Sequence, residues 1–124
     1  MALISVVDDD ASVRSATVDL LSSLGFACAA YASAEEYLGS GRVADTSCLI
    51  LDVNMPGLNG LGLQARLGQL GHSTPIVFIT AYPEDRTRNQ AIRAGAICYL
   101  PKPYNDAELM ECIRSALARG VAPC

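Results

Sequence analysis

Histidine is almost absent from this chain of 124 residues, which contains a single one, His72. It lies in the turn-forming segment GHSTP, where an imidazole is usually solvated, so most catalysis that depends on histidine is excluded. The five cysteines form no CxxC pair and have no histidine nearby, which argues against a zinc site and against a thioredoxin-like site. We expect them to be small buried hydrophobic residues, apart from a loose thiol at Cys124.

Positive charge is also scarce, because nine lysines and arginines stand against 13 aspartates and glutamates and the formal net charge is −4. Binding to nucleic acid requires clustered basic residues that neutralise phosphates, so we expect this chain itself to bind no nucleic acid. A nucleotide-binding loop is not expected either, since Gly57, Gly60 and Gly62 match no GxxxxGK[ST] pattern.

Long apolar stretches are missing as well. None approaches the roughly 20 residues that a membrane span requires, and the N-terminal MALISVVDDD lacks the basic region of a signal peptide. We therefore expect a cytoplasmic protein with no membrane partner. A chain with 51% hydrophobic residues can form one globular domain, expected at residues 1–120 and followed by a tail or the start of a linker at 121–124.

What the chain does contain is an alternation of two patterns. Short apolar runs are typical of strands buried on both faces of a parallel sheet, and they lie at residues 3–7, 26–30, 48–51, 76–80 and 96–100. The helical patterns between them are a periodicity from Val13 to Leu24, a capping box at Ser33–Glu36, a less regular segment at 61–70, a segment from Pro83 to Gly95, and a last helix capped by Asn105, Asp106 and Glu108. The alternation predicts a single α/β domain, a doubly wound sandwich in which helices cover both faces of a five-stranded parallel sheet.

Ligands of such sheets bind beyond the carboxyl ends of the strands. The polar residues at those ends are Asp8, Asp9, Asp10, Asp52, Thr80 and Lys102. Two carboxylates about 4 Å apart repel by about 4 kcal/mol at an effective dielectric constant near 20, so the cluster must take up a proton or a cation. Oxygen ligands without histidine or cysteine favour a hard ion, and a site with room for water and phosphate favours Mg²⁺ over Ca²⁺.

Lys102 is the only lysine of the chain and lies between two prolines in the segment LPKPY. A compact ammonium can pair with a carboxylate or a phosphoryl oxygen where a wide guanidinium would need more room. Pro103 favours extended geometry at Lys102, and the Lys102–Pro103 bond is a candidate cis peptide. Taken alone, the segment would also fit an ordinary loop with a solvated lysine.

In order and spacing, VVDDD at 6–10, LILDVNMPGLNG at 49–60, FITAY at 78–82 and CYLPKPY at 98–104 resemble the receiver domain of two-component response regulators, the CheY-like superfamily. The resemblance extends over essentially the whole chain, and the LPKPY ending is most similar to the FixJ-type subgroup. It implies a (βα)5 fold with the flavodoxin-like strand order 2-1-3-4-5.

The resemblance implies a role for the residues that would carry the chemistry. Asp52 would be the phosphoacceptor and would form 4-aspartylphosphate. Thr80 would hydrogen-bond a phosphoryl oxygen, and Lys102 would pair with Asp52 and later with the phosphoryl group.

The resemblance also implies a set of Mg²⁺ ligands. Asp9 would bind the ion directly, Asp8 would act mainly through water, and Asp52 would bind it together with the backbone carbonyl of Asn54. Asp10 would be surplus to the site and would start the first helix, where its charge suits the helix dipole.

A switch is implied too. The segment 83–95 is polar nearly all round, and a helix with so little to bury is weakly held. With the fifth strand and the last helix it would form the output face, through which phosphorylated copies could pair as a homodimer. Thr80 would move towards the phosphoryl group and vacate space that Tyr99 can fill from outside.

The leading hypothesis is a phosphoacceptor signalling switch of a two-component phosphorelay, phosphorylated in a Mg²⁺-dependent step by a sensor histidine kinase or a phosphotransfer protein, and belonging to a transcriptional regulator. It would catalyse only its own phosphorylation and dephosphorylation. One alternative is a haloacid-dehalogenase-like phosphohydrolase, although that family expects a second acid where this chain has Asn54. Another is a pseudo-receiver that only binds other proteins, against which Asp52, Thr80 and Lys102 argue.

Overall fold

A computed structural model describes residues 2–120. The strands are β1 (Leu3–Val7), β2 (Ala27–Tyr31), β3 (Cys48–Asp52), β4 (Ile76–Thr80) and β5 (Cys98–Pro101), and the helices are α1 (Ala11–Ser23), α2 (Ala34–Leu38), α3 (Gly60–Gln69), α4 (Asp85–Arg93) and α5 (Asp106–Gly120). The tail expected at 121–124, with the thiol of Cys124, lies outside the described residues. No helix among those residues is both long enough and apolar enough to cross a membrane.

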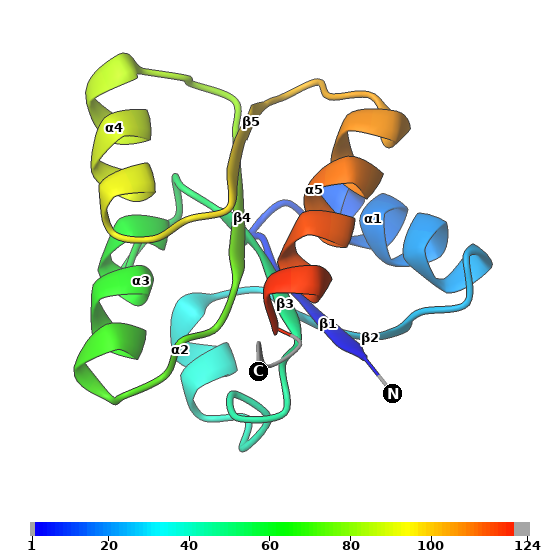
Figure 1. Ribbon diagram of the computed structural model, residues 1–124, viewed down its shortest axis with the longest axis horizontal. Helices are drawn as coiled ribbons and strands as arrows, with labels where there is room; N and C mark the ends of the chain where they lie inside the picture. Colours follow the sequence, from blue (N-terminus) through cyan, green and yellow to red (C-terminus); the bar gives the residue numbers. More distant parts are fainter. Residues whose placement is uncertain (1, 121–124) are drawn as a thin grey trace.

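The five strands form one parallel sheet in the order β2-β1-β3-β4-β5, with helices on both faces (Figure 1). Leu21 of α1 and Ile113 of α5 pack against one face, and Tyr37 of α2, Leu63 of α3 and Ala91 of α4 pack against the other. The predicted doubly wound α/β fold and its strand order are therefore confirmed.

Burial on both faces, expected for all five strands, holds only for the three central ones. Every residue of β1, β3 and β4 is buried, whereas β2 and β5 are partly exposed. Each of these two is an edge strand with a neighbour on one side only, so flanking helices cover it less completely. The apolar runs predicted these strands but placed them one or two residues early, at 26–30 and 96–100 instead of Ala27–Tyr31 and Cys98–Pro101.

Helix starts follow the capping residues. The Asp10 side chain accepts hydrogen bonds from the backbone N–H groups of Ser12 and Val13 and so caps α1, the role expected for it. Asn105 accepts from the N–H of Glu108 at 2.7 Å, and the Glu108 carboxylate accepts from the N–H of Asn105 at 3.4 Å.

One expected helix start is wrong. Pro83 was expected in the first turn of the fourth helix, but α4 begins at Asp85. Glu84 has extended dihedral angles, with φ −131° and ψ 136°, so the chain becomes helical only after it.

The cysteines depart from the expectation of simple buried residues. Cys98 of β5 and Cys112 of α5 form a disulfide, with their Cα atoms 6.0 Å apart, while Cys28 and Cys48 are free. The two partners are 14 residues apart in the sequence, so no short spacing pattern marks them. Packing of α5 on the sheet brings them together.

Candidate functional site

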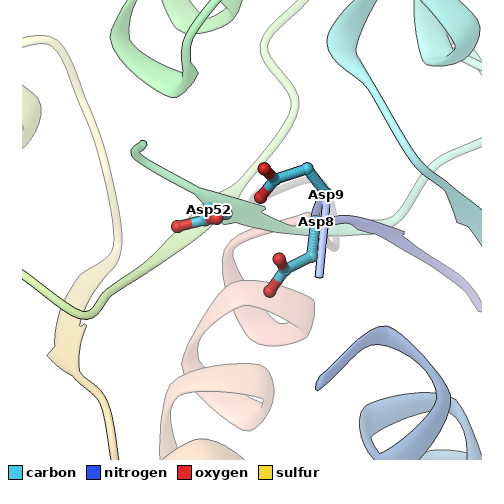
Figure 2. Close-up of side chains that lie close together, drawn as sticks. All are labelled: Asp8, Asp9 and Asp52. Carbon is cyan, nitrogen blue, oxygen red and sulfur yellow. The ribbon is translucent and has the colours of Figure 1, made fainter. Parts of the chain in front are cut away.

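The site is built on the carboxyl ends of two adjacent strands. Val7 pairs with Leu51 across β1 and β3, so the next residues, Asp8 and Asp52, lie side by side at the same edge of the sheet. Asp8 is fully buried and Asp52 is 4% exposed. Figure 2 shows the side chains of Asp8, Asp9 and Asp52 close together at the ends of these strands.

Three carboxylates meet there. Asp8, Asp9 and Asp52 each offer an oxygen atom, and these atoms lie within 4.8 Å of one another. Asp9 is exposed, so the cluster opens to solvent on that side. The structure thus brings together all three carboxylates that the sequence assigned to a metal site, whereas Asp10 turns away to cap α1.

Lys102 supplies positive charge to the cluster. Its Nζ donates to Oδ2 of Asp8 at 3.1 Å and lies 3.8 Å from Oδ1 of Asp52, with the side chain 17% exposed. The expected pairing with Asp52 is therefore present, but the shorter contact is to Asp8. The Lys102–Pro103 peptide bond, the candidate from the sequence, is cis.

The electrostatics of the cluster leave negative charge only partly compensated. Burial raises the pKa of Asp52 to about 7, with the neighbouring Asp8 carboxylate adding to the rise and Lys102 opposing it. An acid of this kind is half-ionised near neutral pH unless another cation arrives. Three carboxylate oxygens with no nitrogen or sulfur ligand suit a hard divalent ion, so these residues fit Mg²⁺.

Thr80 ends β4 beside this cluster, and its buried hydroxyl is already engaged. It donates to Oδ1 of Asn54 at 2.9 Å and accepts from the N–H of Tyr82 at 3.0 Å. The N–H of Asn54 in turn lies 3.4 Å from Oδ1 of Asp52. Sequence reasoning assigned only the backbone carbonyl of Asn54 and missed its side chain, although an amide two residues after Asp52 is a visible signal.

A second residue missed from the sequence is Arg14. Its Nη1 donates to the backbone carbonyl of Asp8 at 2.7 Å, and the N–H of Asp10 donates to Oδ1 of the same aspartate at 2.9 Å. These two bonds fix both the backbone and the carboxylate of Asp8. Position 14 is one turn into α1, so its approach to the strand end becomes visible only when the helix is placed.

Tyr99 lies on β5, on the face of the sheet that α4 covers. Its ring packs on Phe78 with centroids 6.4 Å apart, and its hydroxyl is buried without a hydrogen-bond partner in the described part of the chain. The side chain is half-buried with its hydroxyl inside the protein, and its movement into space vacated by Thr80 stays a prediction. In α4 only Ala91 is buried, and Ile92 is 42% exposed.

Comparison with known proteins adds an independent observation. The family model of the response regulator receiver domain matches residues 4–114. Nodulation protein W of Bradyrhizobium diazoefficiens is 40% identical over 118 residues, which cover 95% of this chain and 52% of that protein. Transcriptional regulatory protein FixJ of Azorhizobium caulinodans is 34% identical over 116 residues, covering 94% of this chain and 55% of that protein. The chain spans about half the length of these curated relatives.

Solved structures agree with the sequence matches. The crystal structure of FixJ-N has a TM-score of 0.88 at 30% identity, covering 99% of this chain and 98% of that chain. A receiver protein from Burkholderia phymatum has a TM-score of 0.82 at 40% identity, with full coverage (100%) of both chains. These likenesses are consistent with the FixJ-type grouping that the LPKPY segment indicated.

Proposed function

The chain belongs to the response regulator receiver domain family, whose members are phosphoacceptor signalling switches, and we propose that Asp52 is the residue that accepts the phosphoryl group. The observation that carries the proposal is the position of Asp52. It is buried at the end of β3 and adjoins two further carboxylates and Lys102. A nucleophile, acidic residues for a metal and a cation thus meet at one strand end.

The proposed transfer needs little covalent help from the protein. An Asp52 oxygen attacks the phosphorus of a phosphohistidine, the P–N bond breaks, and the imidazole leaves with the electron pair and takes up a proton. Mg²⁺, held by Asp8, Asp9, Asp52 and the carbonyl of Asn54, would supply charge neutralisation on the phosphoryl oxygens when bound. His72, the single histidine of these 124 residues, lies in the loop before β4 and outside the acidic cluster, so the donor histidine would lie outside this domain.

Lys102 and Thr80 would then hold the product. The Lys102 ammonium already reaches both buried aspartates, so it can transfer to a phosphoryl oxygen on Asp52 with a small movement. Thr80 can donate to the same group only after its hydrogen bond to Asn54 breaks, because a hydroxyl has one proton to donate. Phosphorylation would therefore move Thr80 away from Asn54.

The response would pass from Thr80 to the neighbouring elements. Thr80 and Tyr99 lie on the adjacent strands β4 and β5, and helix α4 is held by little buried surface. We infer that α4, β5 and α5 form the output face, and that phosphorylated copies pair through it. Weak anchoring of α4 is the feature that supports this inference.

For the whole protein we propose a role in transcription control. The similar curated proteins are about twice as long and include transcriptional regulators, so residues 1–120 would be the receiver part of such a protein. The partner would be a sensor histidine kinase or a phosphotransfer protein, and the domain would catalyse only its own phosphorylation and dephosphorylation.

Neither alternative gains support. The family match is to receiver domains, and the residue two positions after Asp52 is Asn54, not an acid. A pseudo-receiver would not need the charged groups that meet around Asp52.

The proposal is tested by incubating the chain with acetyl phosphate and Mg²⁺ and measuring intact mass, followed by peptide mapping. We expect one phosphoryl adduct, located on Asp52 and absent from Asp52→Asn. Asp10→Asn is the matched control, because asparagine can still cap α1 and the site keeps its three carboxylates. An adduct on Asp52→Asn, no adduct on the wild type, or turnover of a soluble phosphate ester would overturn the proposal.

A further inference from the structure

The disulfide between Cys98 and Cys112 joins a strand to a helix on one face of the sheet. Its Cα separation of 6.0 Å lies within the range that disulfides span. Side chains alternate along a strand, so Cys98 lies with α5 in one core cluster while the next residue, Tyr99, lies with Ala91 of α4 in the other. The bond therefore ties β5 to α5 and does not involve α4.

Reagents can approach this pair from solvent. Cys98 is half-buried, and Cys112, although only 6% exposed, lines a surface groove with Leu100, Glu108 and Glu111. The free thiol of Cys48 contrasts with them, because it is fully buried in the core and burial raises its pKa to about 12. Among residues 2–120, these are the only two cysteines that form a disulfide with each other, and reagents in solvent can reach them.

We propose that Cys98 and Cys112 are a redox modification site, a thiol–disulfide couple that opens and closes. The oxidant would be a low-molecular-weight disulfide of the glutathione type. The Cys98 thiolate attacks one of its sulfur atoms, and the other leaves as a thiolate that takes up a proton. The Cys112 thiolate then attacks the Cys98 sulfur and displaces the second small thiol. Two electrons and two protons pass from the protein, so one small disulfide becomes two thiols.

The couple itself is independent of the proposed function, but its consequence rests on it. In the oxidised chain α5 cannot shift relative to β5, while α4 remains able to move. Oxidation would thus restrict the output face to changes in α4. Phosphorylation of Asp52 would continue, because the hydrogen bonds and ion pairs of the acidic site involve neither cysteine.

The first test follows the thiols. The chain is equilibrated in mixtures of reduced glutathione and glutathione disulfide, alkylated, and measured by intact mass and peptide mapping. We expect a species that carries two fewer alkyl groups than the fully reduced chain, with Cys98 linked to Cys112, and that disappears again in excess reduced glutathione. Cys98→Ser should lose it, and Cys28→Ser, which changes a half-buried free cysteine, should keep it.

Two results with the wild-type chain would overturn the proposed thiol–disulfide couple, independently of the results with the variants. One is that excess glutathione disulfide yields no bond between these cysteines. The other is a bond that persists in excess reduced glutathione, since it would then be a structural disulfide that does not open.

The second test follows the helices by amide hydrogen exchange without phosphorylation. Oxidation should slow exchange in residues 98–101 and 106–119 by at least about threefold and leave 85–93 unchanged. Equal slowing in Cys98→Ser treated in the same way would contradict the link. If acetyl phosphate fails to label Asp52, the proposed function falls while these results stand. If labelling succeeds and the couple does not form, only this inference falls.

Discussion

The acidic site and helix α4 both follow carboxyl ends of the sheet strands, yet they differ in what they bury. The site buries charge: Asp8 and Asp52 are almost inaccessible, and Lys102 compensates them incompletely. Helix α4 buries hardly anything, because Ala91 is its one buried residue and the carbonyl of Ala91 accepts a hydrogen bond from Gln64 of α3. A change of charge in the site therefore has a large effect on the free energy of the protein. Moving α4 costs little, because it disturbs little buried surface.

That difference suggests how a local reaction can produce a larger change. Adding a phosphoryl group changes the charge of the acidic site, where electrostatic interactions are on the order of several kcal/mol. A fraction of that free energy is enough to displace a helix that is held by one buried alanine. The predictions below test whether substitutions at the site have large effects and substitutions around α4 have small ones.

The largest effect is expected for Asp52→Asn in the absence of divalent cations. The ordinary pKa of Asp52 is 3.8, and in the folded protein it is raised to about 7, mainly by burial. Between these values the folded chain holds a proton that the unfolded chain has lost, so wild-type stability falls as pH rises through this window. The asparagine variant lacks this loss and should be more stable by about 2–4 kcal/mol at pH 8.

Urea unfolding at pH 4 and pH 8 with a chelator measures this difference. Near pH 4 the two proteins should differ little, because Asp52 is then protonated in the folded chain. Asp85→Asn, an exposed carboxylate of α4, is the matched control and should stay within about 0.5 kcal/mol of the wild type at both pH values. A stability gap for Asp52→Asn that does not grow with pH would contradict the proposed burial of charge.

A smaller effect is expected for Lys102→Arg. The charge and the fold should survive, but the wider guanidinium cannot reach both Asp8 and a phosphoryl group in the same space. Labelling by acetyl phosphate should slow about tenfold, a loss of about 1.4 kcal/mol in the transition state. The control is Arg93→Lys on α4, which exchanges the same two kinds of side chain in the opposite direction, on a helix instead of in the site. Wild-type labelling by Lys102→Arg would show that charge alone matters.

Tyr99→Phe should change stability by about 1 kcal/mol, and in the favourable direction. The buried hydroxyl of Tyr99 has no partner among residues 2–120, so removing it relieves a desolvation cost. Tyr37→Phe is the control, because that hydroxyl donates to Thr46 at 2.9 Å and its loss should destabilise by about 1 kcal/mol. Chemical denaturation compares the two, and destabilisation by Tyr99→Phe would indicate an unrecognised partner.

The smallest effect is expected for Ile92→Ala on α4. The side chain is 42% exposed, so its truncation should cost no more than about 0.5 kcal/mol. Ile113→Ala on α5 removes a fully buried side chain and should cost about 2–5 kcal/mol in the same unfolding assay. Similar losses for the two variants would show that α4 is anchored as firmly as α5.

The sequence predicted most of the fold because the patterns that decide it are local. Apolar runs marked the five strands, and the polar residues at or just after the ends of these runs included Asp8, Asp52, Thr80 and Lys102, which a parallel sheet must place at one edge. Motif spacing added the family and the residue roles. Local pattern also predicted the weak anchoring of α4.

What the sequence did not predict depends on contacts between distant elements. The disulfide joins Cys98 to Cys112 only because α5 packs on β5. The bond from Thr80 to the Asn54 side chain, and the approach of Arg14 to Asp8, require the relative placement of strands and helices. The inward position of Tyr99 is likewise a result of packing, since the sequence marks only an aromatic residue on an edge strand.

The coupling between the site and α4 is tested most directly by amide hydrogen exchange of residues 85–93 before and after incubation with acetyl phosphate and Mg²⁺. In the wild type, exchange in α4 should change by at least about threefold, and more than in α5, while Asp52→Asn should show no change. Unchanged exchange in α4 of a chain whose Asp52 is phosphorylated would show that the site and α4 are not coupled.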